Sequence, residues 1–345
     1  LYDCNAGAGK TYKVINEIIP KLIKDGEDYV VLAPQHSALR EYRLNNINCE
    51  VIQHYTYRDN ALTSETFPTE KNIIIDEWGM LGSKELMYIF KLHLLGKTII
   101  ALGDYDQLLP VSVSIKSNMV KDKEYTEYMK QAFNGELWIK LLFNNTIRIK
   151  KNYRNNFTPE YYDSLKNGSK DYIQEQMKKH RTHWLKCEYL DIPFRSVAPD
   201  EEISKGKINP HIYTLTLIDP TNIKVGTKLI CNTNKFKCIG LYNKYIVEVK
   251  EVNDKGVILL DDAKNEISLP ITKLISSSED KNKMAFSFAY CRTLYSIQGE
   301  SIEDGIYYPD EELYWLSNRA CYTLISRKKE DKIQYLTPLP QKRRE

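Results

Sequence analysis

A glycine-rich loop within the first dozen residues constrains the fold of this chain more than any other feature. It reads Asn5-Ala6-Gly7-Ala8-Gly9-Lys10-Thr11. Its glycines let the backbone curl so that successive N–H groups face phosphate oxygens, and a helix then opens with its positive end toward the same anion. Lys10 is predicted to reach the β- and γ-phosphates of a nucleotide, and the Thr11 hydroxyl to ligate Mg²⁺. The strict pattern has glycine in place of Cys4, and an ordinary glycine-rich turn before a helix is the alternative.

Two carboxylates follow a short β-branched run, Asn72-Ile73-Ile74-Ile75. Such a run is typical of a buried parallel strand. At the carboxyl end of that strand, beside a phosphate loop, Asp76 is predicted to hold the metal through water. Glu77 is predicted to orient and deprotonate the attacking water. The alternative is that the pair only caps the next helix.

A glutamine and two arginines complete the candidate machinery. The apolar run 98–102 leads into Gly103-Asp104, and Gln107 follows; an amide here can touch the γ-phosphate and report its loss to the next loop. Arg154 and Arg327 each follow an apolar or aromatic stretch far along the chain. Guanidinium groups brought in from a second domain would stabilise charge on the transferring phosphoryl group. Taken singly, each arginine reads as a surface residue; in this order, both are predicted to be arginine fingers.

Strand and helix patterns alternate in the first part of the chain. Apolar residues at helical spacing predict a helix over 10–24 with Gly26 just past its end, and Pro20 predicts a kink or an early break in it. A strand is predicted over 29–33. A further helix is predicted to begin with Ser83 as its cap, to place Leu86, Phe90 and Leu94 on one face, and to end at Gly96. Such alternation indicates a parallel sheet covered by helices.

Composition bounds the class of protein. The 345 residues exceed the usual span of one hydrophobic core, and 42% hydrophobic content suffices for two α/β domains. The formal net charge is only +3, so affinity for nucleic acid would have to come from a local groove. Seven cysteines without a C-x-x-C pair indicate reduced thiols in an intracellular protein. No membrane-spanning run or secretory leader is seen, so no membrane partner is expected.

A last polar segment, 292–301, supplies small hydroxyl residues and an aromatic residue that can face a nucleic-acid backbone, and it places Gln298 and Glu300 toward the nucleotide. With this segment the ordered series of motifs resembles the superfamily 1 helicases of the RecD/Pif1/Dda-like branch over nearly the whole chain. The run Gly103-Asp-x-x-Gln-Leu-x-Pro-Val is distinctive of that branch. The matching motifs are, in chain order, 5–11, 31–34, 76–80, 103–111, 152–154, 293–300 and 322–327.

The resemblance implies an α/β fold of two RecA-like P-loop motor domains, with a small SH3-like β-barrel inserted in the second. Motor domain 1A is expected over 1–140, with a short 1B hairpin at about 57–71. Motor domain 2A is expected over 141–225 and 275–345, and the SH3-like 2B insertion over 226–274. Short β-prone runs separated by turn residues support the insertion. The alternative is that these runs extend the main sheet.

The resemblance also assigns roles to single residues. Tyr153 is expected to stack on adenine, beside Gln298, Gly299 and Glu300 at the nucleotide. The residues expected to contact nucleic acid are Pro34, His54, Thr293, Tyr295 and Ser296. For His54 a position at the edge of the core is the alternative, and for Tyr295 and Trp78 burial in the core competes with stacking on bases. The family usually has histidine where Tyr295 stands, and often threonine where Gln35 stands.

The activity implied is an ATP- and Mg²⁺-dependent DNA helicase that moves 5′ to 3′ on single-stranded or tailed duplex DNA and serves replication or repair. An RNA helicase or RNA-stimulated NTPase of a viral replication complex is one alternative, with RNA as partner; a non-catalytic nucleic-acid clamp is another. The family's base-reading glutamine motif lies upstream of the phosphate loop and is absent here, so a fragment of a longer polypeptide is expected. Its partners would be replication proteins or that missing N-terminal domain. The abundance of Lys, Asn, Ile and Tyr, with 25 tyrosines, suggests an AT-rich genome and hints at a virus or mobile element. A viral source would place the protein in the host cytoplasm or nucleus.

Overall fold

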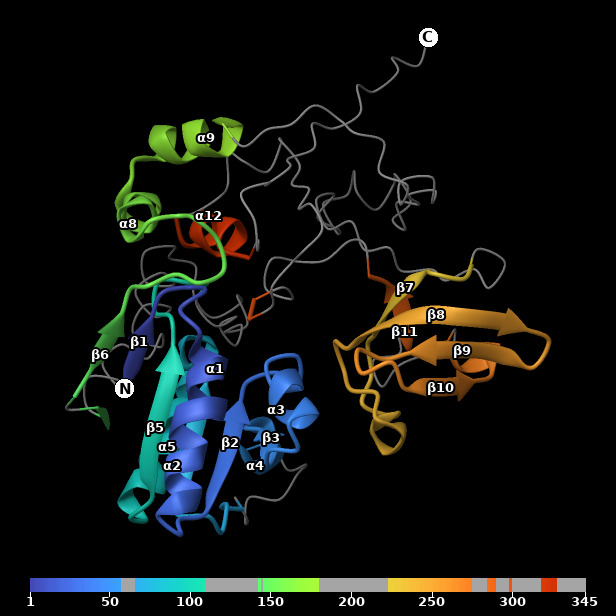
Figure 1. Ribbon diagram of the computed structural model, residues 1–345, viewed down its shortest axis with the longest axis horizontal. Coiled ribbons are helices and arrows are strands. Elements are labelled where there is room, and N and C mark those ends of the chain that lie inside the picture. Colours follow the sequence, from blue (N-terminus) through green and yellow to red (C-terminus); the bar gives the residue numbers. More distant parts are fainter. Residues whose placement is uncertain are drawn as a thin grey trace, which may run out of the picture. The chain divides into compact units, whose positions relative to one another are not determined.

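Six parallel strands form the central sheet of the first of two compact units (Figure 1). The structure is a computed structural model, and it describes residues 1–56, 66–108, 142–143, 145–179, 223–274, 284–289, 298–299 and 318–327. The first unit combines Leu1–Arg181 with Gln298–Glu345, and the second is Thr182–Ile297. The predicted α/β class is confirmed, whereas the predicted domain boundaries and the SH3-like barrel stay predictions.

The central sheet has the strand order β3-β2-β4-β5-β1-β6, and each neighbouring pair is parallel. Parallel strands place all their carboxyl ends at one edge, so the loops that follow β4, β5 and β1 meet there. The strand β6 lies beyond residue 140, where the sequence prediction ended the first motor domain. The strands are β1 (Tyr2–Cys4), β2 (Tyr29–Ala33), β3 (Cys49–Val51), β4 (Asn72–Asp76), β5 (Thr98–Gly103) and β6 (Ile147–Ile149).

The first helical segment runs from Lys10 to Lys24, as predicted, but its middle is a π-helix. The segment consists of α1 (Lys10–Lys13), η1 (Val14–Ile18) and α2 (Ile19–Lys24). The break expected from Pro20 takes this form because a proline lacks the N–H that continues the α-helical ladder. Gly26 follows with a φ of 71°, in the left-handed region that favours glycine at a helix end.

The helix α5 (Ser83–Leu94) corrects two predictions. Its N-cap position is Gly82, so Ser83 is its first residue and not its cap. Leu86, Ile89 and Leu92 are buried, whereas Leu94 is 69% exposed. The buried face therefore follows a spacing of three residues, which Leu94 does not share. The other helices between β2 and β5 are α3 (Arg40–Leu44), α4 (Gln53–Thr56) and η2 (Trp78–Met80).

Three helices of the first unit lie beyond the carboxyl ends of the strands (Figure 1). They are α8 (Pro159–Asn167), α9 (Lys170–Lys179) and α12 (Asn318–Ile325), and α12 packs on both α8 and α9. The Thr158 hydroxyl caps α8 by accepting a hydrogen bond from the backbone N–H of Tyr161. From residue 320 to its end, α12 is buried. This burial brings a helix from the far end of the sequence onto the same edge of the sheet as the phosphate loop.

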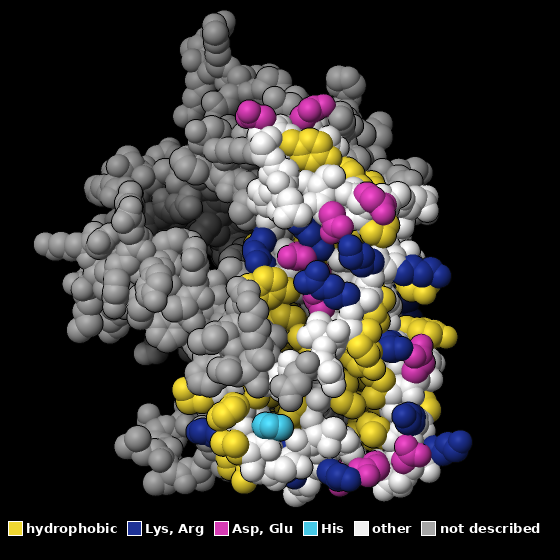
Figure 2. Space-filling view, turned by 90° about the vertical axis from the view of Figure 1, so that its left-hand side faces the viewer, with side chains coloured by type: hydrophobic (Ala, Val, Ile, Leu, Met, Phe, Trp, Pro, Cys, Tyr) yellow, Lys and Arg dark blue, Asp and Glu magenta, His cyan; other side chains and the backbone are white. Residues whose placement is uncertain are grey.

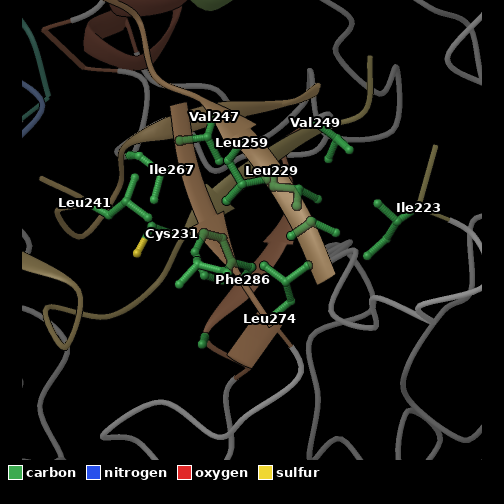
Figure 3. Packing of buried hydrophobic residues seen from close by; sticks show 13 residues of the cluster. Ile223, Leu229, Cys231, Leu241, Val247, Val249, Leu259, Ile267, Leu274 and Phe286 are labelled. Carbon is green, nitrogen blue, oxygen red and sulfur yellow. The ribbon is translucent and has the colours of Figure 1, made fainter. Parts of the chain in front are cut away.

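The second unit is built around a five-stranded antiparallel sheet of order β10-β9-β8-β7-β11. The β-prone runs between 226 and 274 form four strands, and these pair with one another and with β11 in a sheet separate from the parallel one. Figure 3 shows side chains from these strands pointing toward one another in a shared apolar core, as expected for a sheet with one buried face. The elements are β7 (Lys228–Cys231), η5 (Lys237–Ile239), β8 (Ile246–Asn253), β9 (Gly256–Leu260), β10 (Glu266–Leu269), α11 (Ile271–Leu274) and β11 (Phe286–Phe288).

The face of the molecule in Figure 2 intersperses basic and acidic side chains, with apolar side chains among them. This mixture matches the small net charge of the whole chain. Within the described residues, no helix has both the length and the apolar character needed to cross a membrane.

Candidate active site

The glycine-rich loop turns from the end of β1 into α1 and is backed by residues 152–154. Gly7 and Gly9 have φ values of 76° and 73°, which glycine adopts without the strain that a side chain would bring. A Cβ on Gly7 would lie 2.4 Å from Oδ1 of Asn152 and 2.9 Å from Cβ of Arg154, and the Tyr153 N–H donates to the Gly7 carbonyl at 2.8 Å. The loop thus needs glycine both for its turn and for this close approach. Cys4, which replaces the expected glycine, is buried, and burial raises the pKa of its thiol to about 12.

Lys10 is buried among carboxylates. Its Nζ lies 3.4 Å from Oε1 of Glu77, and the two side chains are only 10% and 9% exposed. Burial alone would lower the pKa of Lys10, but the charges of Glu77, Asp76 and Asp104 together raise it. The lysine is therefore a permanent cation at the place where the loop would hold phosphate.

Asp76, at the end of β4, is buried and held by two donors. Tyr42 donates its hydroxyl to Oδ2 at 2.7 Å, and the Glu77 N–H donates to Oδ1 at 2.9 Å. Burial, and then the charge of Glu77, raise the pKa of Asp76 to about 6, against the lowering effect of Lys10. A tyrosine on α3 therefore holds one of the two predicted metal ligands.

Glu77 follows with a φ of 54° and a ψ of 42°, the left-handed conformation. For a residue with a side chain this conformation is strained, and such strain concentrates at functional sites. The left-handed backbone turns the Glu77 carboxylate toward Lys10. The same carboxylate lies near Gly299, because a Cβ built on that glycine would be 3.9 Å from Oε1 of Glu77. The backbone at Glu77 is thus bent to present this carboxylate to the pocket.

Asp76→Asn is expected to raise the melting temperature of the nucleotide-free protein at about pH 7.5 by a few degrees. The folded pKa of Asp76, about 6, lies above its ordinary value of 3.8. Protonation of Asp76 therefore contributes stability that is fully present below about pH 4 and is lost as the pH rises through about 6. The neutral amide removes the cost of the ionised, buried carboxylate, roughly 1–3 kcal/mol.

Thermal unfolding followed by circular dichroism tests this at about pH 7.5 and about pH 5, where the gain should shrink. The control is Glu41→Gln, because Glu41 is an exposed carboxylate on α3. A melting temperature below that of the parent protein at the higher pH would contradict the expectation.

Gln107 lies in the loop after β5 and is bound to Asp104. Its Nε2 donates to Oδ2 of Asp104 at 3.0 Å, and its Oε1 is buried without a partner among the described residues. Tyr322, on α12, donates its hydroxyl to the same Oδ2 at 2.6 Å and accepts the Ala6 N–H at 2.9 Å. The glutamine loop, the phosphate loop and α12 are therefore joined by one set of buried hydrogen bonds.

Arg154 and Arg327 lie close together through Ser326, the residue before Arg327. Arg154 binds Ser326 although 172 residues separate the two in the sequence. The Ser326 carbonyl accepts from Nη1 of Arg154 at 2.8 Å, and its hydroxyl accepts from Nη2 of Arg327 at 3.2 Å. Burial, and then the positive charge of Arg327, lower the pKa of Arg154 to about 10, while Glu77 opposes this. Two guanidinium groups are thus held close to each other and within electrostatic reach of the Lys10–Glu77 pair.

These residues fit a nucleoside triphosphate. Two neighbouring buried cations repel each other unless an anion lies near them, and the loop offers backbone N–H groups for phosphate. The buried Oε1 atoms of Gln107 and Gln298 have no partner among the described residues, so both amides retain capacity to bind a ligand or water. Among the described residues no group of three or more His, Cys, Asp or Glu side chains could hold a metal alone. A magnesium ion here would need phosphate oxygens as further ligands, as Mg²⁺ usually does.

The structure places Tyr153 at the mouth of the phosphate loop. Its ring is 66% exposed, and a Cβ on Gly9 would lie 3.7 Å from its Cδ2. Lys151 lies over the ring, with Nζ 4.5 Å from the centroid. An exposed ring next to a phosphate loop has a face available for a base, so the predicted stacking on adenine is sterically possible.

The predicted nucleic-acid contacts are only partly described. Pro34 is half-buried directly after β2, at the same edge of the sheet as the phosphate loop. His54 is exposed on α4, which follows the short strand β3. Trp78 is 4% exposed in the core, stacked on Tyr105 with centroids 6.0 Å apart, which matches burial and not stacking on bases. Thr293, Tyr295, Ser296 and Glu300 lie outside the described residues, as do most of the expected 1B hairpin and the residues Leu109, Pro110 and Val111.

Three residues of the site carried no functional role in the sequence analysis. Tyr42, Tyr322 and Lys166 each contact the candidate machinery, and Lys166 does so by donating to Oδ1 of Asn5 at 2.9 Å and pairing with Asp106 at 2.8 Å. A polar stripe at helical spacing, Arg319, Tyr322, Thr323 and Ser326, was the available signal for Tyr322. No pattern in the sequence distinguishes Lys166 from the other lysines.

Comparison with known proteins places this site in a familiar fold. Residues 1–131, which include the phosphate loop, Asp76, Glu77 and Gln107, match the family described as AAA domain. A structure of Pif1 helicase from Bacteroides in complex with ADP-AlF3 and single-stranded DNA aligns over 98% of this chain and 88% of its own, with a TM-score of 0.60 and 15% identity. The chain has the Pif1 fold.

Two further structures agree. A structure of DNA unwinding at forked duplex DNA by two coordinating Pif1 helicases aligns with a TM-score of 0.60 and 14% identity over 98% of this chain and 87% of the other. The Pif1 helicase of Candida albicans gives a TM-score of 0.58 and 16% identity over 98% and 91%. No curated protein matches the sequence. The resemblance inferred from the motif series is therefore confirmed at the level of the Pif1 fold.

Proposed function

We propose that this protein is a DNA helicase or translocase that couples ATP hydrolysis to movement on single-stranded DNA and to duplex unwinding. The observation that carries the proposal is the convergence of Lys10, Glu77, Gln107, Arg154 and Arg327 on one buried cluster of linked side chains. These residues come from segments spread over the length of the sequence. A turn that bound phosphate for structural reasons would need neither the carboxylate nor the arginines. The named complexes of Pif1 helicases with ADP-AlF3, single-stranded DNA and forked DNA support the same proposal.

Binding of the triphosphate would rearrange the buried contacts around Lys10. Lys10 is paired with Glu77 at 3.4 Å, so the carboxylate that should act on water is occupied by the lysine. Phosphate oxygens would take the ammonium, because the loop N–H groups and Lys10 together favour a multiply charged anion. Glu77 would then be released to accept a proton from water in line with the γ-phosphate. Arg154 and Arg327 would stabilise the charge that builds on the transferring phosphoryl group.

Thr11 and Asp76 are the residues that would hold Mg²⁺. The ion would neutralise charge on the phosphates, as in other phosphoryl-transfer enzymes. Tyr42 keeps the Asp76 carboxylate in place through its hydroxyl. The arrangement leaves the carboxylate oxygens of Asp76 engaged by two hydrogen bonds, which is consistent with contact to the metal through water.

The remaining parts of the proposal concern nucleic acid. Pro34, His54, Thr293, Tyr295 and Ser296 are the proposed contacts along a single strand, and stepping is proposed to follow motion between two RecA-like domains. The antiparallel sheet of the second unit is the proposed SH3-like insertion. The proposed partners are replication proteins or a preceding domain of the same polypeptide, within the cell.

Hydrolysis of ATP is expected to rise at least tenfold when single-stranded DNA is added, because nucleic acid should complete the active arrangement of the arginines. Phosphate release is measured with oligodeoxynucleotides, with oligoribonucleotides of the same sequence, and without either. Stimulation by RNA alone would favour the RNA-dependent alternative. Hydrolysis that neither polymer stimulates, with binding intact, would favour a clamp.

Unwinding is expected to require a 5′ single-stranded tail. The direction follows from the RecD/Pif1/Dda-like resemblance and not from any single residue. Displacement of a labelled strand is compared on duplexes that carry a 5′ tail, a 3′ tail or no tail, with ATP and Mg²⁺ present. Activity only on the 3′-tailed duplex would refute the assigned polarity while leaving the proposed ATPase in place.

A further inference from the structure

One buried hydroxyl joins the phosphate loop to the glutamine loop. Tyr322 is fully buried; it accepts the Ala6 N–H at 2.9 Å and donates to Oδ2 of Asp104 at 2.6 Å. The direction of both bonds is forced, because an amide nitrogen can only donate and an ionised carboxylate can only accept. Burial raises the pKa of Tyr322 well above its usual value, so the hydroxyl keeps the proton that this arrangement needs. The side chain bridges two elements that are separated by about a hundred residues in the sequence.

The same carboxylate fixes the orientation of the Gln107 amide. Oδ2 of Asp104 accepts from Nε2 of Gln107 at 3.0 Å, and Oδ1 accepts the Asp106 N–H at 3.0 Å. Since the carboxylate offers only acceptors, the nitrogen of the amide must face Asp104 and the oxygen must face away. That oxygen is buried without a partner among the described residues. An amide oxygen can accept a hydrogen bond from water, but it cannot donate to a phosphate oxygen.

The ring and the backbone around Tyr322 are held by separate contacts. Lys166 lies over the ring, with Nζ 4.7 Å from the centroid, and Tyr162 meets it edge-on at 5.2 Å. The Thr323 hydroxyl accepts the Leu108 N–H at 3.1 Å, and Arg319 donates to the Gln107 carbonyl at 3.2 Å. Loss of the Tyr322 hydroxyl should therefore leave α12 docked on the loop. The hydroxyl can be tested separately from the packing.

We propose that Tyr322 is a positioning residue that acts through Asp104 to keep the oxygen of the Gln107 amide turned toward the attacking water. This inference rests on the proposed function. It refines the role predicted for Gln107 from the sequence: in this arrangement the glutamine presents an acceptor to water and does not donate to the γ-phosphate. Because the hydroxyl also binds the Ala6 N–H, the amide is held correctly only when α12 and the phosphate loop are both in place.

Tyr322→Phe is expected to lower kcat for ATP hydrolysis by about tenfold, with KM for ATP unchanged, because the hydroxyl positions a group that acts after the nucleotide has bound. In a Gln107→Ala background the same substitution is expected to have no further effect, since residues that act in series are not additive. The control is Tyr88→Phe. Tyr88 is a buried tyrosine on α5 whose hydroxyl donates to the Thr66 carbonyl, outside the pocket. It should keep the parental kcat.

A second measurement does not need turnover. Hydrogen–deuterium exchange of the peptides that contain Ala6 and 104–108 should be faster in Tyr322→Phe than in the parent protein and unchanged in Tyr88→Phe. Unchanged exchange in both peptides would overturn the inference even if the protein did not hydrolyse ATP. A kcat within twofold of the parent, or a drop that adds fully to that of Gln107→Ala, would also overturn it while leaving the proposed function intact. An inactive parent protein with faster exchange would instead refute the proposed function alone.

Discussion

Glu77→Gln is expected to lower kcat for ATP hydrolysis by about a thousandfold, within the range that a positioned general base contributes. The substitution keeps the size of the side chain and removes only its ability to take a proton. Lys10 retains two other carboxylates near it, Asp76 and Asp104, so it should stay charged and should still bind phosphate. ATP affinity is therefore expected to be kept, because Glu77 acts on water and not on the nucleotide.

The measurement combines equilibrium binding of a fluorescent ATP analogue with phosphate release in the presence of single-stranded DNA. Glu85→Gln is the matched control. Glu85 is another buried glutamate, on α5 and outside the pocket, and its replacement should leave kcat near the parental value. Parental turnover by Glu77→Gln would show that another group is the base. A loss of ATP binding in the same variant would show that Glu77 acts on the nucleotide site and not only on water.

The parallel sheet and the pocket at its edge could be predicted because they depend on local patterns and one topological rule. The apolar run before Asp76 forms a strand that is buried throughout, the run before Gly103 forms one that is buried in its second half, and the two strands are parallel. Parallel strands bring their carboxyl ends to one edge whatever their order in the sheet. The positions of Lys10, Asp76, Glu77 and Gln107 follow from this rule without knowledge of any side-chain contact.

The contacts that hold the pocket together could not be predicted, because they join residues far apart in the sequence. Tyr322 is 316 residues from Ala6 and 218 from Asp104, and Lys166 is 161 residues from Asn5. No periodicity records such a pairing; it depends on how α8 and α12 pack. A small error came from the same cause. Leu94 fits an apolar pattern, but α5 turns another face to the sheet.

Arg327→Ala is expected to slow ATP hydrolysis by on the order of a thousandfold, the effect typical of an arginine finger. The side chain is 1% exposed, and its Nε and Nη2 donate to the Thr323 carbonyl at 3.1 Å and to the Ser326 hydroxyl at 3.2 Å. These bonds fix the guanidinium of Arg327 close to that of Arg154. Burial, and then the charge of Arg327, lower the pKa of Arg154. Two like charges held together in the interior are costly. The protein would tolerate this cost if the pair meets the charge of the transferring phosphoryl group.

The loss should appear in kcat and not in ATP affinity, because the charge that Arg327 meets develops in the transition state. Phosphate release and nucleotide binding are measured for Arg327→Ala, for Arg327→Lys and for Arg148→Ala. Arg148 is an exposed arginine of the same unit, paired with Asp3 at 3.1 Å, and its replacement should change little. Arg327→Lys should recover only part of the rate, since lysine keeps the charge without the planar donors.

A loss below about tenfold in Arg327→Ala would assign Arg327 a structural role, because removal of a transition-state contact costs more than that. The opposite result, a full loss with the melting temperature kept, would identify the buried arginine pair as the charge that the fold holds ready for hydrolysis.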